Sequence, residues 1–341
     1  MAGTTLISSL TFTQFADTTA RIFYAGKDLP LVKDLNDLMS IYMVDYIPRS
    51  TGEQRVYDEI DGETYAHFKA QGADATKTQA IAGYSTTMTV RRFAAEIDIS
   101  YEAREYGKEQ QIISKLTSLS TFCPQKMALD LTHRFTFATA TSYTDMDGES
   151  VSTAVGDALA LASASHTLTG SSSTYSTIIT GNPQFSQGGF ETAKNQSNTQ
   201  ILNNFGERRI LNFNTVICSD QDAATLREIR QLLNSTADID AAQSGVANVY
   251  ANMFKLNVLP RLATTATGAY DSTKAKYWAY LAVGEFEAHL GVWEEPHLKM
   301  PAPSNNGEDA HNDNWTFGAR CGYGITIPSP KGFLLSTGLG V

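Results

Sequence analysis

The sequence predicts an α+β protein, and three patterns carry this prediction. Apolar residues keep helical spacing over residues 102–141, and they alternate strictly from Trp315 to Ile327, as in a long strand. Between these segments, a short apolar strand over Thr215–Cys218 precedes another helical pattern. The chain has 341 residues, 42% hydrophobic and 18% charged, so it has enough apolar material for a packed core.

Charge and composition exclude several classes of protein. The formal charge is −10, and such a surface repels phosphate, which argues against a dedicated nucleic-acid-binding protein. The apolar runs are shorter than the ~20 residues of a membrane span, and the N-terminus lacks the pattern of a secretory signal. Cys123, Cys218 and Cys321 are too few and too widely spaced for a disulfide framework or a cysteine-rich zinc site. We expect three buried, reduced thiols.

The start of the chain predicts an arm followed by a helix. Residues 1–28 are rich in Thr and Ser without a sustained period, so we interpret them as an arm that binds across a neighbouring subunit. An amphipathic helix is predicted from about Pro30 to Tyr46, and Pro48 ends it. Its apolar face consists of Leu31, Leu35, Leu38, Met39, Tyr42, Met43 and Tyr46.

The next segment, from Glu53 to Ser100, predicts extended chain. Arg92–Tyr101 alternates between apolar and charged residues and is typical of a half-buried strand. The stretch before it is polar and acidic, and predicts a two-stranded excursion with its tip at residues 72–77. Because an isolated hairpin is marginally stable in water, we expect something outside this subunit to hold it.

The helical pattern over 102–141 is the longest in the chain. A helix of about 35 residues would be roughly 50 Å long, more than a compact domain requires. Pro124 lies inside the pattern and is expected to kink the helix or divide it in two.

The second half of the chain predicts a mixed middle and a long last strand. After the strand at Thr215–Cys218, Asp220 or Asp222 is expected to cap a helix. Tyr277–Val283 is continuously apolar, which favours a strand buried on both faces. The apolar face of Trp315–Ile327 is expected to pack against the long helix.

The sequence contains none of the common nucleotide-binding, zinc-protease, serine-hydrolase or redox motifs. The histidines, at positions 67, 133, 166, 289, 297 and 311, show no ligand spacing, so we predict no metal site, no cofactor and no catalytic residue. Ser163, Ser165 and His166 with Asp157 could be imagined as a hydrolase constellation, but loop hydrogen bonding is the favoured interpretation. The pairs Arg91–Arg92 and Arg208–Arg209 are expected to form salt bridges to another subunit.

Two passages carry a resemblance to a known family. GDALALASASHTL, at 156–168, is similar to a segment in capsid subunits of the Mu-like and related groups, and NDNWTFGARCGYGITIPSPKGFLLSTG, at 312–338, is similar to the closing stretch of those proteins. With the order of arm, helix, excursion, long helix, mixed middle and terminal strand, the chain resembles the major capsid protein of tailed bacteriophages, with the Hong Kong 97-type fold.

The resemblance implies a division of the chain. Residues 1–50 would form the N-terminal arm with its helix, and 51–100 the extended E-loop. The peripheral domain, with its long spine helix, would take 101–149 and 291–328, and the axial domain 150–290 and 329–341. The excursion would lie over the long helix of a neighbour.

The function implied is structural: self-assembly into pentamers and hexamers of an icosahedral shell around double-stranded phage DNA, with no enzyme activity. The alternatives are an encapsulin-like shell around protein cargo and, from another class, a Ser/His hydrolase. A tail tube or adhesin would suit the Ser/Thr-rich stretches, but the long helix argues against it.

The resemblance also implies partners. We expect a separate scaffolding protein, since only about 28 residues precede the first predicted helix, together with a portal and a decoration protein. Packaged DNA would be contacted without sequence specificity, and no membrane is involved. The subunit would reside in the virion capsid after assembly in the cytoplasm of the host bacterium. Lys69 and Lys77 lie in the E-loop, but no pattern singles out a cross-linking partner.

Overall fold

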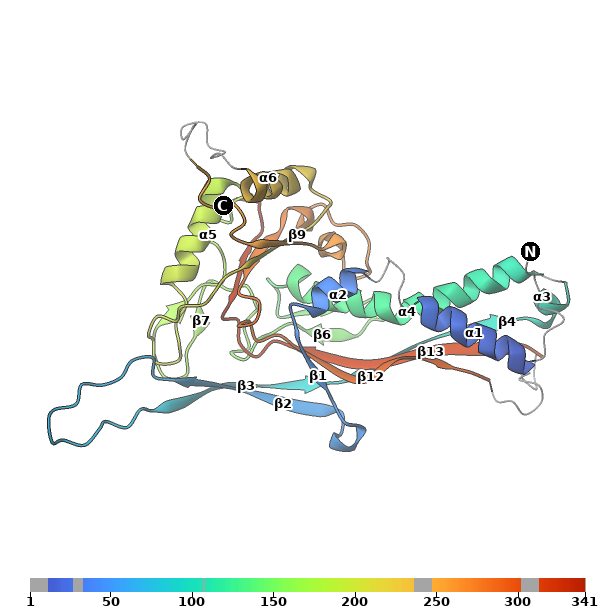
Figure 1. Cartoon of the computed structure of the whole chain (residues 1–341), viewed down its shortest axis with the longest axis horizontal. Coiled ribbons are helices and arrows are strands. Elements are labelled where there is room, and N and C mark those ends of the chain that lie inside the picture. Colours follow the sequence, from blue (N-terminus) through green and yellow to red (C-terminus); the bar gives the residue numbers. More distant parts are fainter. Residues whose placement is uncertain (1–11, 27–32, 107, 236–246, 302–312, 341) are drawn as a thin grey trace.

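The computed structural model describes residues 12–26, 33–106, 108–235, 247–301 and 313–340 (Figure 1). The helices are α1 (Phe12–Gly26), α2 (Lys33–Met39), α3 (Tyr101–Glu105), α4 (Glu109–Thr136), α5 (Gln187–Thr199) and α6 (Ala223–Asn234). The longer strands are β1 (Met43–Tyr46), β2 (Gln54–Gly62), β3 (Ala80–Thr89), β4 (Arg91–Ile99), β9 (Thr215–Cys218), β10 (Lys255–Val258), β11 (Trp278–Leu281), β12 (His289–Lys299), β13 (Trp315–Thr326) and β14 (Phe333–Ser336). Two short pairs are β5 (Ser142–Thr144) with β6 (Ser150–Ser152), and β7 (His166–Thr167) with β8 (Thr174–Tyr175). The predicted α+β class is confirmed.

One sheet, of order β1–β12–β13–β4, packs against α4 (Figure 1). Strand β13 alternates as predicted, with Trp315, Phe317, Ala319, Cys321 and Tyr323 buried in the same core as the buried face of α4. The hydroxyl of Tyr323 donates to Asp130 of the helix over 2.7 Å. The expected packing of the last long strand on the long helix is therefore confirmed.

The long helix differs from its prediction in where it breaks. Pro124 lies inside one continuous helix of 28 residues, and the break comes earlier, between α3 and α4. Just before the proline, the hydroxyls of Ser120 and Thr121 donate to the carbonyls of Thr117 and Ser118. The expectation that Pro124 divides the helix is wrong.

The N-terminal segment corrects the arm interpretation for the residues that the structure describes. Phe12, Phe15, Ala16, Thr19 and Phe23 are buried at three- and four-residue steps, so α1 is an amphipathic helix packed on its own subunit. The ring of Phe15 lies 4.8 Å from that of Trp315. The period was missed because Ala16 and Thr19 fill positions on the apolar face that large apolar residues usually take. The part of the expected arm over residues 1–11 lies outside the described residues.

The helix predicted from Pro30 to Tyr46 is also shorter than expected. It ends at Met39, and Met43–Tyr46 forms strand β1, which pairs in parallel with β12. Residues after Met39 leave the helix because sheet pairing with β12 satisfies their backbone groups. The first part of the predicted apolar face is confirmed, because Leu35 and Leu38 are buried in the core.

A second sheet, of order β10–β9–β11–β14, lies between two cores. On one face Ile217, Ala279 and Leu335 join the core of α4, and on the other Cys218, Trp278 and Leu334 join a second core shared with α5 and α6. The predictions for this region are confirmed, because β11 is buried on both faces and Asp222 caps α6.

The three cysteines are buried and free, as predicted. Among the helices that the structure describes, none is both long and apolar enough to cross a membrane.

The packing of α1 can be tested with Phe15→Ala. Because the Phe15 side chain is 1% exposed, its removal leaves a cavity against Trp315 and Phe317 and should lower the free energy of unfolding by about 3–5 kcal/mol. Denaturant titration followed by circular dichroism measures this loss. The control is Thr13→Ala, at an exposed position of the same helix, which should change stability little. Equal stability of both variants would show that α1 does not pack on its own subunit.

Candidate functional site

The feature that stands apart from both cores is the hairpin of β2 and β3, whose loop projects from the body at the lower left of Figure 1. The strands pair antiparallel from Gln54↔Thr89 to Gly62↔Ala80, with an irregularity between Asp58 and Ile60. Every residue from Thr64 to Ala80 is exposed, including Lys69, Lys77 and the tip at 72–77. The predicted two-stranded excursion is confirmed.

Strand β2 has an inverted distribution of side chains. Its acidic residues Glu59 and Asp61 are buried, whereas Val56 and Ile60 are 55% and 71% exposed. Soluble proteins usually bury the apolar face of a strand and leave charges in water. Beyond the strand, Phe68 in the loop is 92% exposed. The outer face of the hairpin therefore exposes Val56 and Ile60 beside the polar Asp58, Ser85 and Thr87, and its inner face hides two carboxylates.

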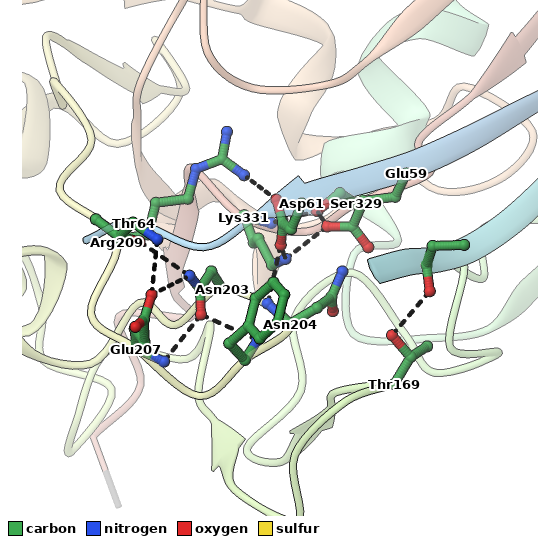
Figure 2. Close-up of polar contacts among 12 residues, drawn as sticks. Glu59, Asp61, Thr64, Thr169, Asn203, Asn204, Glu207, Arg209, Ser329 and Lys331 are labelled. Carbon is green, nitrogen blue, oxygen red and sulfur yellow. Dashed lines mark hydrogen bonds and ion pairs between the residues drawn. The ribbon is translucent and has the colours of Figure 1, made fainter. Parts of the chain in front are cut away.

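The charged inner face binds one lysine. Lys331 Nζ lies 2.6 Å from Glu59 Oε1 and 2.6 Å from Asp61 Oδ2, and its side chain is only 3% exposed (Figure 2). The Ser329 hydroxyl donates to Glu59 Oε1 over 3.0 Å. A buried charge is tolerated only when it is paired and hydrogen-bonded, and this arrangement meets both conditions. We call Glu59, Asp61, Arg209, Ser329 and Lys331 the root cluster.

A loop over residues 203–209 completes the attachment (Figure 2). Arg209 Nη1 donates to Asp61 Oδ1 over 3.1 Å, and the Asn204 amide donates to Asp61 Oδ2 over 2.9 Å. Two residues past the end of β2, the Thr64 amide donates to Glu207 Oε2 over 2.9 Å. The root of the hairpin is thus held from two segments distant in sequence, 203–209 and 329–331.

Strand β3 is attached to the body separately. The Thr169 hydroxyl donates to the Ala82 carbonyl over 3.1 Å, and the hydroxyls of Tyr84 and Thr167 are 2.7 Å apart (Figure 2 draws the first bond). Gly83 lies against the root cluster, where a Cβ would be 2.5 Å from Glu59 Oε2. A side chain at this position would displace the buried carboxylate.

The contacts of the root cluster favour the ionised form of Asp61. Burial opposes ionisation of Asp61, but the hydrogen bond and charge of Lys331 outweigh it, so the pKa of Asp61 is lowered. Nearby, burial and the charge of Glu59 raise the pKa of Glu287. The cluster therefore favours ionised Asp61 with Lys331 and resists a further negative charge beside them.

The imagined hydrolase constellation is only partly assembled. His166 Nδ1 donates to Asp157 Oδ2 over 2.8 Å, and burial is outweighed by this bond, so the pKa of Asp157 is lowered. However, His166 Nε2 lies 3.0 Å from Thr177 Oγ1, and in the described part of the chain neither Ser163 nor Ser165 bonds the imidazole through its hydroxyl. Both His166 and Thr177 are 0% exposed, so no substrate reaches them. The arrangement suits the favoured interpretation, hydrogen bonding that holds a loop.

The remaining candidates are scattered. Across the described residues no group of three His, Cys, Asp or Glu side chains could hold a metal ion. His289 and His297 lie on β12, where His289 stacks on Tyr57 with ring centroids 4.2 Å apart. His311 lies outside the described residues.

The basic pairs are used within the subunit. Arg92 Nη2 lies 3.4 Å from Glu53 Oε1, and Arg91 Nη1 lies 3.9 Å from Asp145 Oδ2. Arg209 is paired to Asp61. Salt bridges of these arginines to another subunit stay a prediction.

Sequence reasoning missed the root cluster. Its one visible signal is Lys331, a single charge in the otherwise uncharged stretch from Cys321 to Val341. In the sequence, Glu59 and Asp61 are two of several acidic residues in the polar stretch predicted to be an excursion. No local pattern pairs residues that are 272 and 270 positions apart.

The root cluster predicts a pH-dependent effect of Lys331→Met. The change leaves buried Glu59 without a cation and Asp61 with Arg209 alone, so at pH 7 it should cost about 3–5 kcal/mol of unfolding free energy. Because the pKa of Asp61 is lowered in the fold, its stabilisation is present above the unfolded pKa of about 3.9 and is lost as pH falls through the folded pKa. Without Lys331 the carboxylates bind protons more readily, so the difference between variant and wild type should shrink from pH 7 to pH 4.

Urea titrations at several pH values measure this difference. The matched control is Lys255→Met, which removes an exposed lysine and should have a small effect at every pH. A triple variant, Glu59→Gln, Asp61→Asn and Lys331→Met, should recover part of the loss at pH 7. A loss for Lys331→Met that is small, or constant over the whole pH range, would contradict the role given to this lysine.

Comparison with known proteins gives the family. The model of the family described as phage capsid protein matches residues 83–336, well over half of the chain. No curated protein sequence matches. Among solved structures, the capsid of the cyanophage P-SCSP1u has a TM-score of 0.48 at 9% identity, covering 86% of this chain and 85% of that chain. The structure from Microbacterium phage Oxtober96 has a TM-score of 0.48 at 10% identity, covering 87% and 89%. A virus-like particle from Pyrococcus furiosus has a TM-score of 0.45 at 13% identity, covering 94% and 97%. On the match of the family model, the chain belongs to the phage capsid protein family.

Proposed function

We propose that this capsid protein is the major head subunit, which assembles as pentamers and hexamers into an icosahedral shell around double-stranded phage DNA. The observation that carries the proposal is the inverted strand β2, with Val56 and Ile60 outside and Glu59 and Asp61 inside. Burying a large apolar side chain contributes about 1.5–3 kcal/mol, and this hairpin leaves several in water. A neighbouring subunit that covers the hairpin recovers that free energy.

The root cluster supports an assembly role for the hairpin. A projecting arm that must meet a neighbour benefits from a fixed direction, since a rigid arm loses less entropy on binding. Lys331, Arg209 and the Asn204 amide fix Asp61 from different sides. The hairpin is thus oriented before the neighbour arrives.

The proposal keeps the division of the chain that the resemblance implies. The peripheral domain would take residues 101–149 and 291–328, which contribute α4 and most of β12 and β13. The axial domain would take 150–290 and 329–341, in agreement with the pairing of β14 and β11 in the second sheet. Residues 51–100 would form the E-loop. Residues 1–50 are no longer proposed as an exchanged arm, because α1 packs on its own subunit.

As a member of a capsid family the chain is a structural protein of the virion. We propose that it has no catalytic function, and that assembly takes place in the cytoplasm of the bacterial host with a scaffolding protein, a portal and a decoration protein as partners. The formal charge of −10 supports DNA contact without tight binding. The buried His166 argues against the hydrolase alternative. An encapsulin-like shell would be recognised by protein cargo in place of DNA inside purified particles.

The experiment that tests the proposal deletes residues 72–77 at the hairpin tip. All six residues are exposed, so the subunit should keep its melting temperature. Closed shells, counted by electron microscopy and sedimentation, should become rare because a contact with the neighbour is lost. A control replaces the same six residues with Gly and Ser, which separates the length of the loop from its sequence. Normal yield and stability of shells from the deletion variant would refute the assembly role of the tip.

A further inference from the structure

Two of the three cysteines meet between the long helix and the long strand. Cys123 lies on α4 and Cys321 on β13, and both are buried in the same core, with exposed fractions of 3% and 0%. The third, Cys218, lies on β9 and belongs to the second core, which β9 shares with α5 and α6. The fold therefore brings together one pair of thiols and keeps the third apart from it.

The register of the helix on the strand places this pair. The Tyr323 hydroxyl donates to Asp130, which aligns one point of β13 with one point of α4. Cys321 precedes Tyr323 on the same face of the strand, and one such step covers about 6.6 Å, equal to about four residues of helix. Moving back by this step from Asp130 leads to the part of α4 whose buried face carries Cys123 and Met127.

The neighbouring strand gives a second, independent position. Phe93 of β4 pairs with Cys321, and its ring centroid lies 5.4 Å from Nζ of Lys126, in the helical turn that begins at Cys123. The thiol of Cys321 donates a hydrogen bond to the sulfur of Cys123, so the two side chains are in contact. This bond lowers the pKa of Cys123, whereas the bond and burial together raise the pKa of Cys321.

Cys123 also lines a pocket of about 380 Å³ at the surface. Its neighbours in the lining, Phe122 and Met146, are 40% and 55% exposed, so the pocket communicates with solvent. One water needs roughly 10–15 Å³, and hydrogen peroxide is only slightly larger, so a small oxidant enters this pocket. Cys123 is the member of the pair that such an oxidant reaches, because Cys321 is fully buried behind it.

We propose that Cys123 and Cys321 are a modification site, which a peroxide converts into a disulfide that links α4 to β13. The Cys123 thiolate attacks one peroxide oxygen, the O–O bond breaks, and a sulfenic acid and hydroxide form. The sulfur of Cys321 then attacks the sulfenic sulfur, the S–S bond forms, and the S–O bond breaks. The leaving hydroxide takes the Cys321 proton, so two thiols and one peroxide yield a disulfide and two waters.

The conditions for this step follow from the compartment. Disulfides are rare in a reducing cytosol and persist in oxidising surroundings outside cells. On the function proposed above, the subunit passes from the first to the second when a virion is released. A bond between α4 and β13 would then join the two longest elements of the subunit, which otherwise touch through side-chain packing and hydrogen bonds.

The test treats purified full-length protein with hydrogen peroxide or with dithiothreitol, unfolds it and alkylates the free thiols. In wild type the three free thiols should fall to one, and mass spectrometry of unreduced peptides should find Cys123 joined to Cys321 within one chain. The oxidised protein should melt about 5 °C higher than the reduced protein, because the bond restricts the unfolded chain.

The variants separate the bond from other oxidation. Cys321→Ala should form no disulfide and show no rise in melting temperature, and its response to peroxide measures the effect of methionine oxidation. The matched control is Cys218→Ala, which also removes a buried thiol but keeps the pair, and should gain the disulfide as wild type does. Circular dichroism checks that each variant is folded. If Cys321→Ala fails to fold, the peptide mapping of wild type still decides.

Three free thiols in peroxide-treated wild type would overturn the proposal. So would a disulfide to Cys218 or to a second chain, or equal melting temperatures of the oxidised and reduced forms. The mapping does not depend on whether shells form, so its failure would leave the proposed assembly function in place, and a failure of assembly would leave the disulfide to be judged by the mapping.

Discussion

The length of α4 constrains the rest of the subunit. With 28 residues this helix is about 42 Å long, and the 12 residues of β13 extend about 40 Å, so the two elements match. The helix and the strand stay close along their whole length. Near the start of α4, Lys115 donates to the carbonyl of Asp98, which pairs with Thr316 at the start of β13. Near the end of α4, Arg134 donates to the carbonyl of Ile325 at the end of β13. An unbroken helix of this length has to be covered along one face from end to end. The remaining strands of the sheet, α1 and α2 supply that cover, and the result is a thin, extended body with the second sheet at one end (Figure 1).

This constraint explains which parts of the fold could be predicted. The pattern over 102–141, the alternation of Trp315–Ile327 and the apolar run at Tyr277–Val283 each report burial along one regular element, and all three correspond to elements of the structure. The failures have a different cause. Met43–Tyr46 keeps helical spacing but becomes a strand, because β12 offers it a parallel partner more than 240 residues later in the chain. Helix α1 escaped detection because Ala16 and Thr19 lie on its buried face. Pairing and packing across the chain override a local period.

The candidate site was predictable only as an outline. The polar, acidic composition of residues 53–91 indicates a hairpin without its own core, and that is what the structure contains. Which acids are buried does not follow from composition, because it depends on Lys331 and Arg209, which approach from other elements. Buried ion pairs often add little net stability, since the loss of hydration offsets their attraction. Such a cluster fixes the position of the strand. Asp61 accepts from a lysine, an arginine and a backbone amide, and all three bonds form only when Asp61 occupies this position.

The register of β2 shows why that definition matters. A slip by one residue would exchange the two faces of the strand, burying Val56 and Ile60 and exposing Glu59 and Asp61. For an isolated subunit the slipped register satisfies the usual preference for apolar residues inside. The root cluster opposes it, because Lys331 would then be buried without its carboxylates, at a cost of several kcal/mol, and Arg209 would lose its contact with Asp61. The observed register therefore leaves Val56 and Ile60 on the outside of the subunit, on either side of the exposed Asp58. The root cluster holds this register within the subunit, and a neighbour that covers Val56 and Ile60 recovers the apolar burial that the register gives up. The ion cluster inside the hairpin and the contact proposed outside it therefore lie on opposite faces of the same strand.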